Sequence, residues 1–182
     1  MSSQGDVTAV SRGLHLVQPP IESVGMSTSL AVLPEPGLPA PVARGKIMAI
    51  QRACQGLPDG QRMDESPPLK HWLAPGIYAR EIHLPAGTLV VGKIHRHRHL
   101  NIISQGRITC YTEYGLEHHQ APSSFISEPG TKRVVYTHED AIWTTIHPNP
   151  TNETDITKLE EMNVALEYAE LGMEVIEKEL IE

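Results

Sequence analysis

The feature that most restricts the fold is a series of short apolar runs between residues 71 and 148, interrupted by glycines and prolines. The runs "GIYAREIHLPAG", "TLVVGKIH", "LNIISQGRITCYTEYG" and "AIWTTIHP" are rich in Val, Ile, Thr and Tyr. Such runs are typical of strands in sandwiches and barrels. Helical stretches do not alternate with them, so a parallel α/β sheet is not expected. We expect the interior to contain Leu89, Val91, Ile103, Ile108, Phe125, Val134 and Ile142.

Residues 1–46 predict an extended N-terminal arm. They contain six prolines, five glycines and no aromatic residue. Proline lacks a backbone N–H and has a fixed φ, so we expect neither regular sheet nor a long helix here. Such a segment has little with which to build a core of its own. We therefore expect the Pro-rich arm to become ordered by lying on neighbouring subunits of a homo-oligomer or on other assembly proteins.

Residues 47–70 predict a short helix followed by a linker. In "KIMAIQRACQG" (46–56), Ile47, Ile50 and Cys54 recur at helical spacing and Gly56 is a stop signal. The "LPDGQRMDESPP" stretch that follows is typical of a loop.

Residues 149–182 predict an acidic amphipathic helix. Thr157 and Glu160 have the spacing of a capping box. Apolar residues then recur at helical spacing, with a bend expected at Gly172. The apolar stripe is Leu159, Met162, Leu166, Ala169, Met173, Ile176 and Leu180. We favour packing of this helix on its own barrel over binding of a partner.

The net charge of −7 is concentrated at the C-terminal end. Residues 153–182 hold ten acidic side chains and two lysines, a balance of −8, which leaves about +1 for the other residues. Without a basic excess we expect no nucleic-acid binding. No apolar run approaches the roughly 20 residues of a membrane helix, and the N-terminus lacks a signal-peptide pattern. Two distant cysteines favour a reducing compartment.

The run "GKIHRHRHLNIISQG" (92–106) places His95, His97 and His99 at alternating positions. In a strand these side chains share one face. Neighbours in this series stand about 7 Å apart and can share an ion, whereas His95 and His99 on a straight strand stand about 13 Å apart. A metal site therefore requires a sharp bend in the strand or a ligand from another strand, for which His138 is the candidate.

We interpret the histidine run as a site for a divalent ion, either Zn, Fe, Mn or Ni. Imidazole is the commonest protein ligand for such ions. The alternative is a His/Arg strand that stacks, forms hydrogen bonds or titrates near pH 6–7. We expect His118 and His119 to lie at the surface in a turn, and His147 to be structural.

The histidine pair and the glycine that ends "NIISQG" resemble the first motif of the RmlC-like cupins. These are small jelly-roll barrels, or double-stranded β-helices, that hold a metal among histidines and one glutamate. Counting back from Gly106 puts the glutamate position on His99, so His95 and His97 match the His-x-His pair. The resemblance covers about residues 71–148 and implies a cupin-type barrel.

The second cupin motif resembles "SEPGTKRVVYTH" (127–138). Its usual histidine falls on Arg133, and His138 lies five residues further on. Two of the four usual ligand positions are thus altered. Arg133 is a candidate to hold a carboxylate or phosphate group in the barrel mouth. As an alternative, it pairs with Glu128 or Glu139.

The block from "LKHWLAPGIYAREI" through "PGTKR" to "HEDAIWTTIHP" also resembles cupin-type proteins encoded by tailed bacteriophages. This likeness implies a structural or interaction component of a phage particle, found in the host cytoplasm and the virion, and we favour that function. One alternative is a metal-dependent enzyme of the oxygenase or isomerase type. No carboxylate stands out as its general base, and Glu81 and Glu113 stay open for that role. Another is a sugar or anion binder without turnover.

Overall fold

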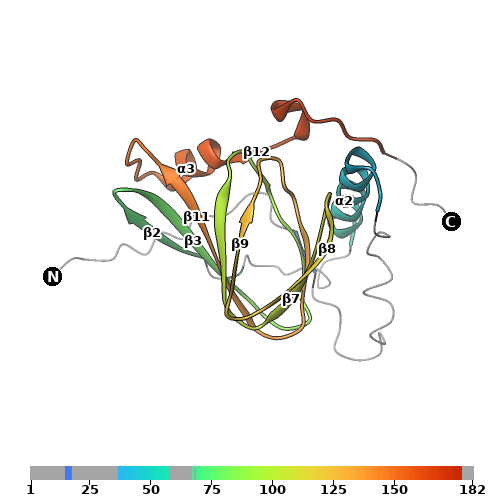
Figure 1. Ribbon diagram of the computed structural model, residues 1–182, viewed down its shortest axis with the longest axis horizontal. Coiled ribbons are helices and arrows are strands. Elements are labelled where there is room, and N and C mark those ends of the chain that lie inside the picture. The colour runs from blue at the N-terminus through green and yellow to red at the C-terminus, as the bar shows by residue number, and fades with distance from the viewer. Residues whose placement is uncertain (1–14, 18–36, 58–66, 68, 178–182) are drawn as a thin grey trace.

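The computed structural model describes residues 15–17, 37–57, 67 and 69–177 (Figure 1). These residues form two five-stranded sheets and a two-stranded ribbon, and all of the paired strands are antiparallel. In spatial order, the first sheet consists of β1 (His15–Val17), β4 (Leu89–Val91), β10 (Val134–Thr137), β7 (Arg107–Thr112) and β8 (Gly115–Gln120). The second consists of β2 (Leu69–Ala74), β3 (Gly76–Leu84), β11 (Ala141–Asn149), β6 (His99–Gln105) and β9 (Ser123–Ser127). The ribbon joins β12 (Val164–Ala165) to β5 (Ile94–His95).

The core lies between the two five-stranded sheets. Along β10 and β7, successive side chains point to opposite faces of the first sheet. Val135 and Cys110 face the second sheet, whereas Val134 and Tyr111 face helix α2 (Ala40–Gln55). The core cluster contains Leu84, Val90, Ile103, Ile108, Cys110, Val135, Ala141 and Trp143. The expected all-β jelly-roll fold is confirmed.

The predicted interior residues divide between these two packing faces. Val91 and Val134 are buried, but they pack against α2 rather than inside the barrel. Ile103 and Ile108 are buried in the core. The side chains that keep partial exposure are Leu89, Phe125 and Ile142.

The N-terminal prediction needs two corrections. His15–Val17 pair with β4, so part of the expected arm forms sheet on the chain's own barrel. Helix α2 begins at Ala40, before the predicted start, because Pro41 lies in its first turn, where a missing N–H breaks no helical hydrogen bond. The remainder of the predicted arm, 1–14 and 18–36, and residues 58–66 of the linker lie outside the described residues.

The C-terminal helix is much shorter than predicted. α3 (Ile156–Asn163) ends where Val164 and Ala165 pair with β5, and a 3-10 turn, η1 (Tyr168–Leu171), follows. Asp155 caps α3 by accepting hydrogen bonds from the backbone N–H groups of Thr157 and Lys158, so the predicted cap at Thr157 is wrong. Residues 178–182 lie outside the described chain.

The C-terminal segment runs across one end of the barrel, from α3 beside β11 to the neighbourhood of α2 (Figure 1). Its last described part is fixed to α2, because Ile176 N donates to Pro41 O at 2.9 Å. No helix in the described ranges is both long and apolar enough to cross a membrane.

Candidate metal centre

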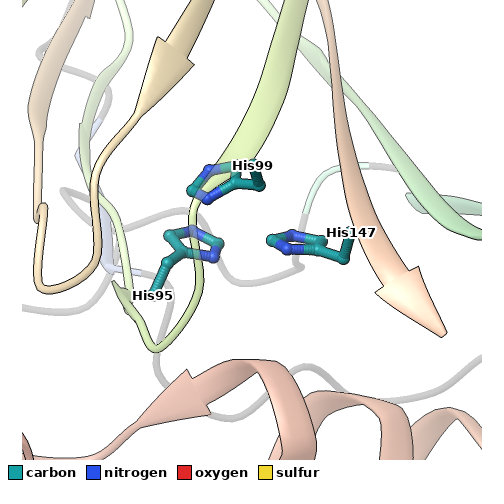
Figure 2. Close-up of side chains that lie close together, drawn as sticks. All are labelled: His95, His99 and His147. Carbon is teal, nitrogen blue, oxygen red and sulfur yellow. The ribbon is translucent and has the colours of Figure 1, made fainter. Parts of the chain in front are cut away.

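Three buried histidines meet at the end of the barrel that the C-terminal segment crosses (Figure 2). His95 ends β5, His99 begins β6, and His147 lies on β11. The chain bends at Arg96 and His97, so His95 and His99 are not held apart as they would be on a straight strand. The register of β11 against β6 pairs Ile146 with Leu100. Continuing it by one residue places His147 opposite His99.

The three rings are in mutual contact. Their centroids are 4.4 Å apart for His95 and His99, 4.6 Å for His99 and His147, and 5.0 Å for His95 and His147. One ligand nitrogen from each ring lies within 4.8 Å of the other two. The exposed fractions of these residues are only 8%, 4% and 3% for His95, His99 and His147.

The hydrogen bonds of His99 fix its tautomer. Its Nδ1 lies 2.9 Å from the carbonyl oxygen of His97. Because a carbonyl only accepts, Nδ1 carries the proton and Nε2 keeps its lone pair. His99 Nε2, His95 Nδ1 and His147 Nδ1 are buried and have no hydrogen-bond partner among the described residues. Such atoms are costly unless a ligand satisfies them.

Burial keeps the three imidazoles neutral. It lowers the pKa of His147 to about 3 and that of His99 to about 4. Burial also lowers the pKa of His95 well below its ordinary value, and His99 adds to the effect. Neutral imidazole is the form that binds metal ions.

Two of the predicted ligands lie outside this cluster. His97 is exposed at the bend, and its Nε2 lies 3.1 Å from the carbonyl oxygen of Met162. His138 Nε2 is 2.7 Å from Thr109 Oγ1. The bend explains the difference at His97, because the residue between two inward-pointing histidines is turned toward the C-terminal segment.

The other two histidines of the sequence prediction lie on β8 rather than in a turn. His118 is exposed and contacts Thr109, whereas His119 is half-buried and stacks on Phe125. The structure places neither of them in the cluster.

The sequence predicts a structural role for His147, yet this residue completes the cluster. One signal could have identified it. In "AIWTTIHP" the residues Trp143, Thr145 and His147 alternate along one strand, so they share a face. Trp143 is a core residue, which directs the other two toward the barrel interior.

The cluster adjoins a pocket inside the barrel of about 580 Å³, counting its open mouth. His95 and His99 line it together with Arg133. Its other lining residues include both apolar and charged or polar side chains. They are Ile82, Leu84, Val90, Val135 and Trp143, with Gly92, and Arg80, Lys93, Asn101, Thr131 and Thr145.

Glu160 of α3 joins the pocket to the C-terminal segment. Lys93 Nζ donates to both of its carboxylate oxygens at 3.0 Å, and Arg80 Nη1 donates to one of them at 3.3 Å. The two carboxylates singled out from the sequence do not line the pocket. Glu81 pairs with Lys70 and His83, and Glu113 lies 3.6 Å from Arg44.

No protein-family model matches this chain, and no curated protein matches it. Solved structures similar to it include a cupin-2 domain protein from Shewanella frigidimarina, with 10% identity, a TM-score of 0.40, and coverage of 48% of this chain and 85% of that one. The Cnp3 cupin domain of Schizosaccharomyces pombe has 17% identity, a TM-score of 0.39, and coverage of 51% and 68%. Ectoine synthase from P. lautus has 12% identity, a TM-score of 0.42, and coverage of 48% and 67%. At these TM-scores the fold assignment rests on the strand order of the chain itself.

Proposed function

We propose that this protein is a metal-dependent enzyme that acts on a small molecule, with His95, His99 and His147 as the ligands of one divalent ion. One observation carries the proposal: three buried imidazoles converge beside a pocket, and each has a buried nitrogen without a partner in the described chain. A purely structural stack of histidines does not require that each of three contacting rings keep a buried nitrogen without a partner.

The residues fit such an ion by their chemistry. All three rings are held neutral by burial, and the His97 carbonyl orients His99 as a carbonyl or carboxylate commonly orients a metal-bound histidine. Nitrogen atoms bound to one ion at about 2.1 Å stand roughly 3.4 Å apart. The ligand nitrogens lie within 4.8 Å of one another, so they would move closer together on binding an ion.

Three protein ligands are the donor number of catalytic rather than structural zinc sites, which leaves a position open. When bound, an ion in such a site polarises a substrate oxygen or lowers the pKa of a bound water. The chain supplies the surroundings. Val90, Val135 and Trp143 give the pocket apolar lining, and Arg133 offers a positive charge beside the histidines.

Elemental analysis of untagged protein tests the metal centre. We expect about one divalent ion per chain in the wild type. His95→Ala, His99→Ala and His147→Ala should each lose it, since two imidazoles rarely retain an ion that three hold.

Two histidine variants provide matched controls. His97→Ala and His138→Ala remove imidazoles that lie outside the cluster, so they should keep the ion. A protein that purifies without metal and takes none up, or that loses it only in the two controls, contradicts the assignment.

The interaction role suggested by the phage likeness is the second candidate. One observation favours it: the β2–β3 hairpin exposes Trp72, Leu73 and Ile77, with exposed fractions of 50%, 45% and 45%. Against it, His15–Val17 of the proposed arm pair with the chain's own β4. If the hairpin is an interface, Trp72→Ser with Ile77→Ser should reduce the molar mass measured by light scattering. An unchanged mass counts against an interface at this hairpin.

A further inference from the structure

Arg133 is a buried cation that points into the pocket. Its exposed fraction is 7%, and its Nε has no hydrogen-bond partner among the described residues. The guanidinium lies over the ring of Phe125, 5.2 Å from the centroid, and lines the same pocket as His95 and His99. The side chain is therefore positioned toward the space that a ligand would occupy.

The carboxylates that could neutralise Arg133 are engaged elsewhere. Glu128 pairs with Arg98 at 3.0 Å, and Glu139 pairs with Arg107 at 3.4 Å. These two pairs remove the alternative partners that the sequence left open for Arg133.

The two remaining carboxylates near the pocket also have other partners. Glu160 neutralises Lys93 and Arg80. Glu117 accepts a hydrogen bond from His119 Nε2 at 3.3 Å, which lowers its pKa, and the nearby charge of Arg133 lowers this pKa further. In the described part of the chain, Arg133 has no ion pair with a carboxylate.

A buried guanidinium without a counter-charge is unfavourable, and an anionic ligand would offset that cost. Guanidinium groups bind carboxylates through two parallel hydrogen bonds. The apolar side chains that line the same pocket include Val90, Val135 and Trp143. These side chains suit the hydrocarbon part of an organic acid better than a bare inorganic ion.

We propose that the pocket binds a small organic carboxylate, with its carboxylate on Arg133 and its hydrocarbon body against Val90, Val135 and Trp143. In this orientation the ligand also lies beside His95 and His99. The part of this inference that makes the acid a substrate rests on the proposed function. The binding itself requires only Arg133 and the apolar wall.

Butyrate is a suitable probe, and Trp143 is a suitable reporter. The chain has two tryptophans, so Trp72→Phe leaves Trp143 as the sole one. In this full-length background, treated with EDTA, we expect butyrate to change the Trp143 fluorescence in a saturable way. Butyramide, its neutral isostere, should bind about tenfold or more weakly because it lacks the charge. Calorimetry provides a second measurement that is independent of the fluorophore.

The decisive variant is Arg133→Met, with Arg98→Met as the matched control. Arg133→Met should weaken butyrate binding about tenfold or more, and Arg98→Met should leave it unchanged, because Arg98 pairs with Glu128 outside the pocket. Equal binding of butyrate and butyramide by the parent protein overturns the proposal without relying on any variant. So does equal binding of butyrate by Arg133→Met, or binding of inorganic phosphate but not butyrate.

The same titration separates this proposal from the metal centre. His147→Ala should lose the ion but still bind butyrate, since His147 does not line the pocket and Arg133 remains. If elemental analysis finds no metal while butyrate binds through Arg133, the enzyme proposal fails and the carboxylate site stands. If metal is bound but butyrate binding does not depend on Arg133, the carboxylate site fails alone.

Discussion

His147 combines two contacts that a surface histidine does not make. Its ring stacks on Tyr78, with centroids 6.1 Å apart, and faces His95 and His99. Its removal from water lowers its pKa to about 3. Burial keeps this imidazole neutral, which is the form that binds a metal ion. For the same reason the metal-free fold is sensitive to acid.

Acid should destabilise the metal-free protein through this cluster. The unfolded histidines have a pKa near 6.5, whereas burial lowers that of His147 to about 3 and that of His99 to about 4 in the fold. The unfolded chain thus binds protons first as the pH falls. The stabilisation is complete above about pH 6.5 and decreases as the pH drops toward about 4 and then 3.

Urea unfolding in EDTA between pH 7 and pH 4 measures this dependence. His147→Phe removes one such group but keeps an aromatic ring against Tyr78. Its free energy of unfolding should fall less steeply than that of the wild type, by up to about 1.4 kcal/mol per pH unit. Parallel curves for the two proteins would show that His147 is not a buried neutral imidazole.

The sequence predicts His95 and His99 as metal ligands, but it does not identify His147 as the third one. Strict alternation placed His97 with them, because nothing local marks the bend at Arg96. His147 joins through the register of β11 on β6, a long-range pairing that a local pattern does not specify. The alternation from Trp143 was the only indication that His147 faces inward.

At the scale of elements, α3 is tied to the barrel mouth through one acidic residue. Glu160 is paired with Lys93 and Arg80, whose side chains are 5% and 11% exposed. Glu160→Gln would leave these two cations without a carboxylate. We expect the free energy of unfolding to fall by about 1–3 kcal/mol. The expected loss is smaller than for a fully buried pair, because Glu160 is partly exposed and solvent screens its charge.

The neighbouring Glu161 supplies the matched control, because it is exposed on the same helix. Glu161→Gln should change the stability by no more than about 0.5 kcal/mol. Chemical denaturation of both variants at pH 7 measures the difference. Equal stabilities would mean that α3 is held without the help of Glu160.

The apolar spacing in the sequence predicts the wrong C-terminal end for helix α3. The apolar stripe that predicted a long C-terminal helix does contain Leu159, which is buried on α3. Beyond Asn163, however, Val164 and Ala165 pair with β5, and Leu166 becomes 85% exposed. Tertiary pairing thus overrode a helical spacing that continues in the sequence. The strands between residues 71 and 148 were predictable because glycines, prolines and turns separate them in the sequence.

At the scale of the whole molecule, the proposed metal ligands come from two different sheets. His99 and His147 belong to the second sheet, whereas His95 belongs to the ribbon that β5 forms with β12 of the C-terminal segment. An ion held by all three would link the barrel to that segment. Since only the folded chain brings the ligands together, binding must stabilise the fold.

Thermal unfolding of EDTA-treated protein should detect this link. With an ion at about 100 times its Kd, the stabilisation is about 2.7 kcal/mol, which for a chain of this size corresponds to an increase in Tm of roughly 5–10 °C. Zn, Ni, Mn and Fe(II) can be compared in turn, the last under anaerobic conditions. His147→Phe should show no increase, while His97→Ala should respond like the wild type, because its imidazole lies outside the cluster. An equal increase in the Tm of His147→Phe would assign the effect to ions bound elsewhere on the chain. The barrel and the C-terminal segment would then be joined by the β5–β12 pairing and by side-chain contacts such as those of Glu160.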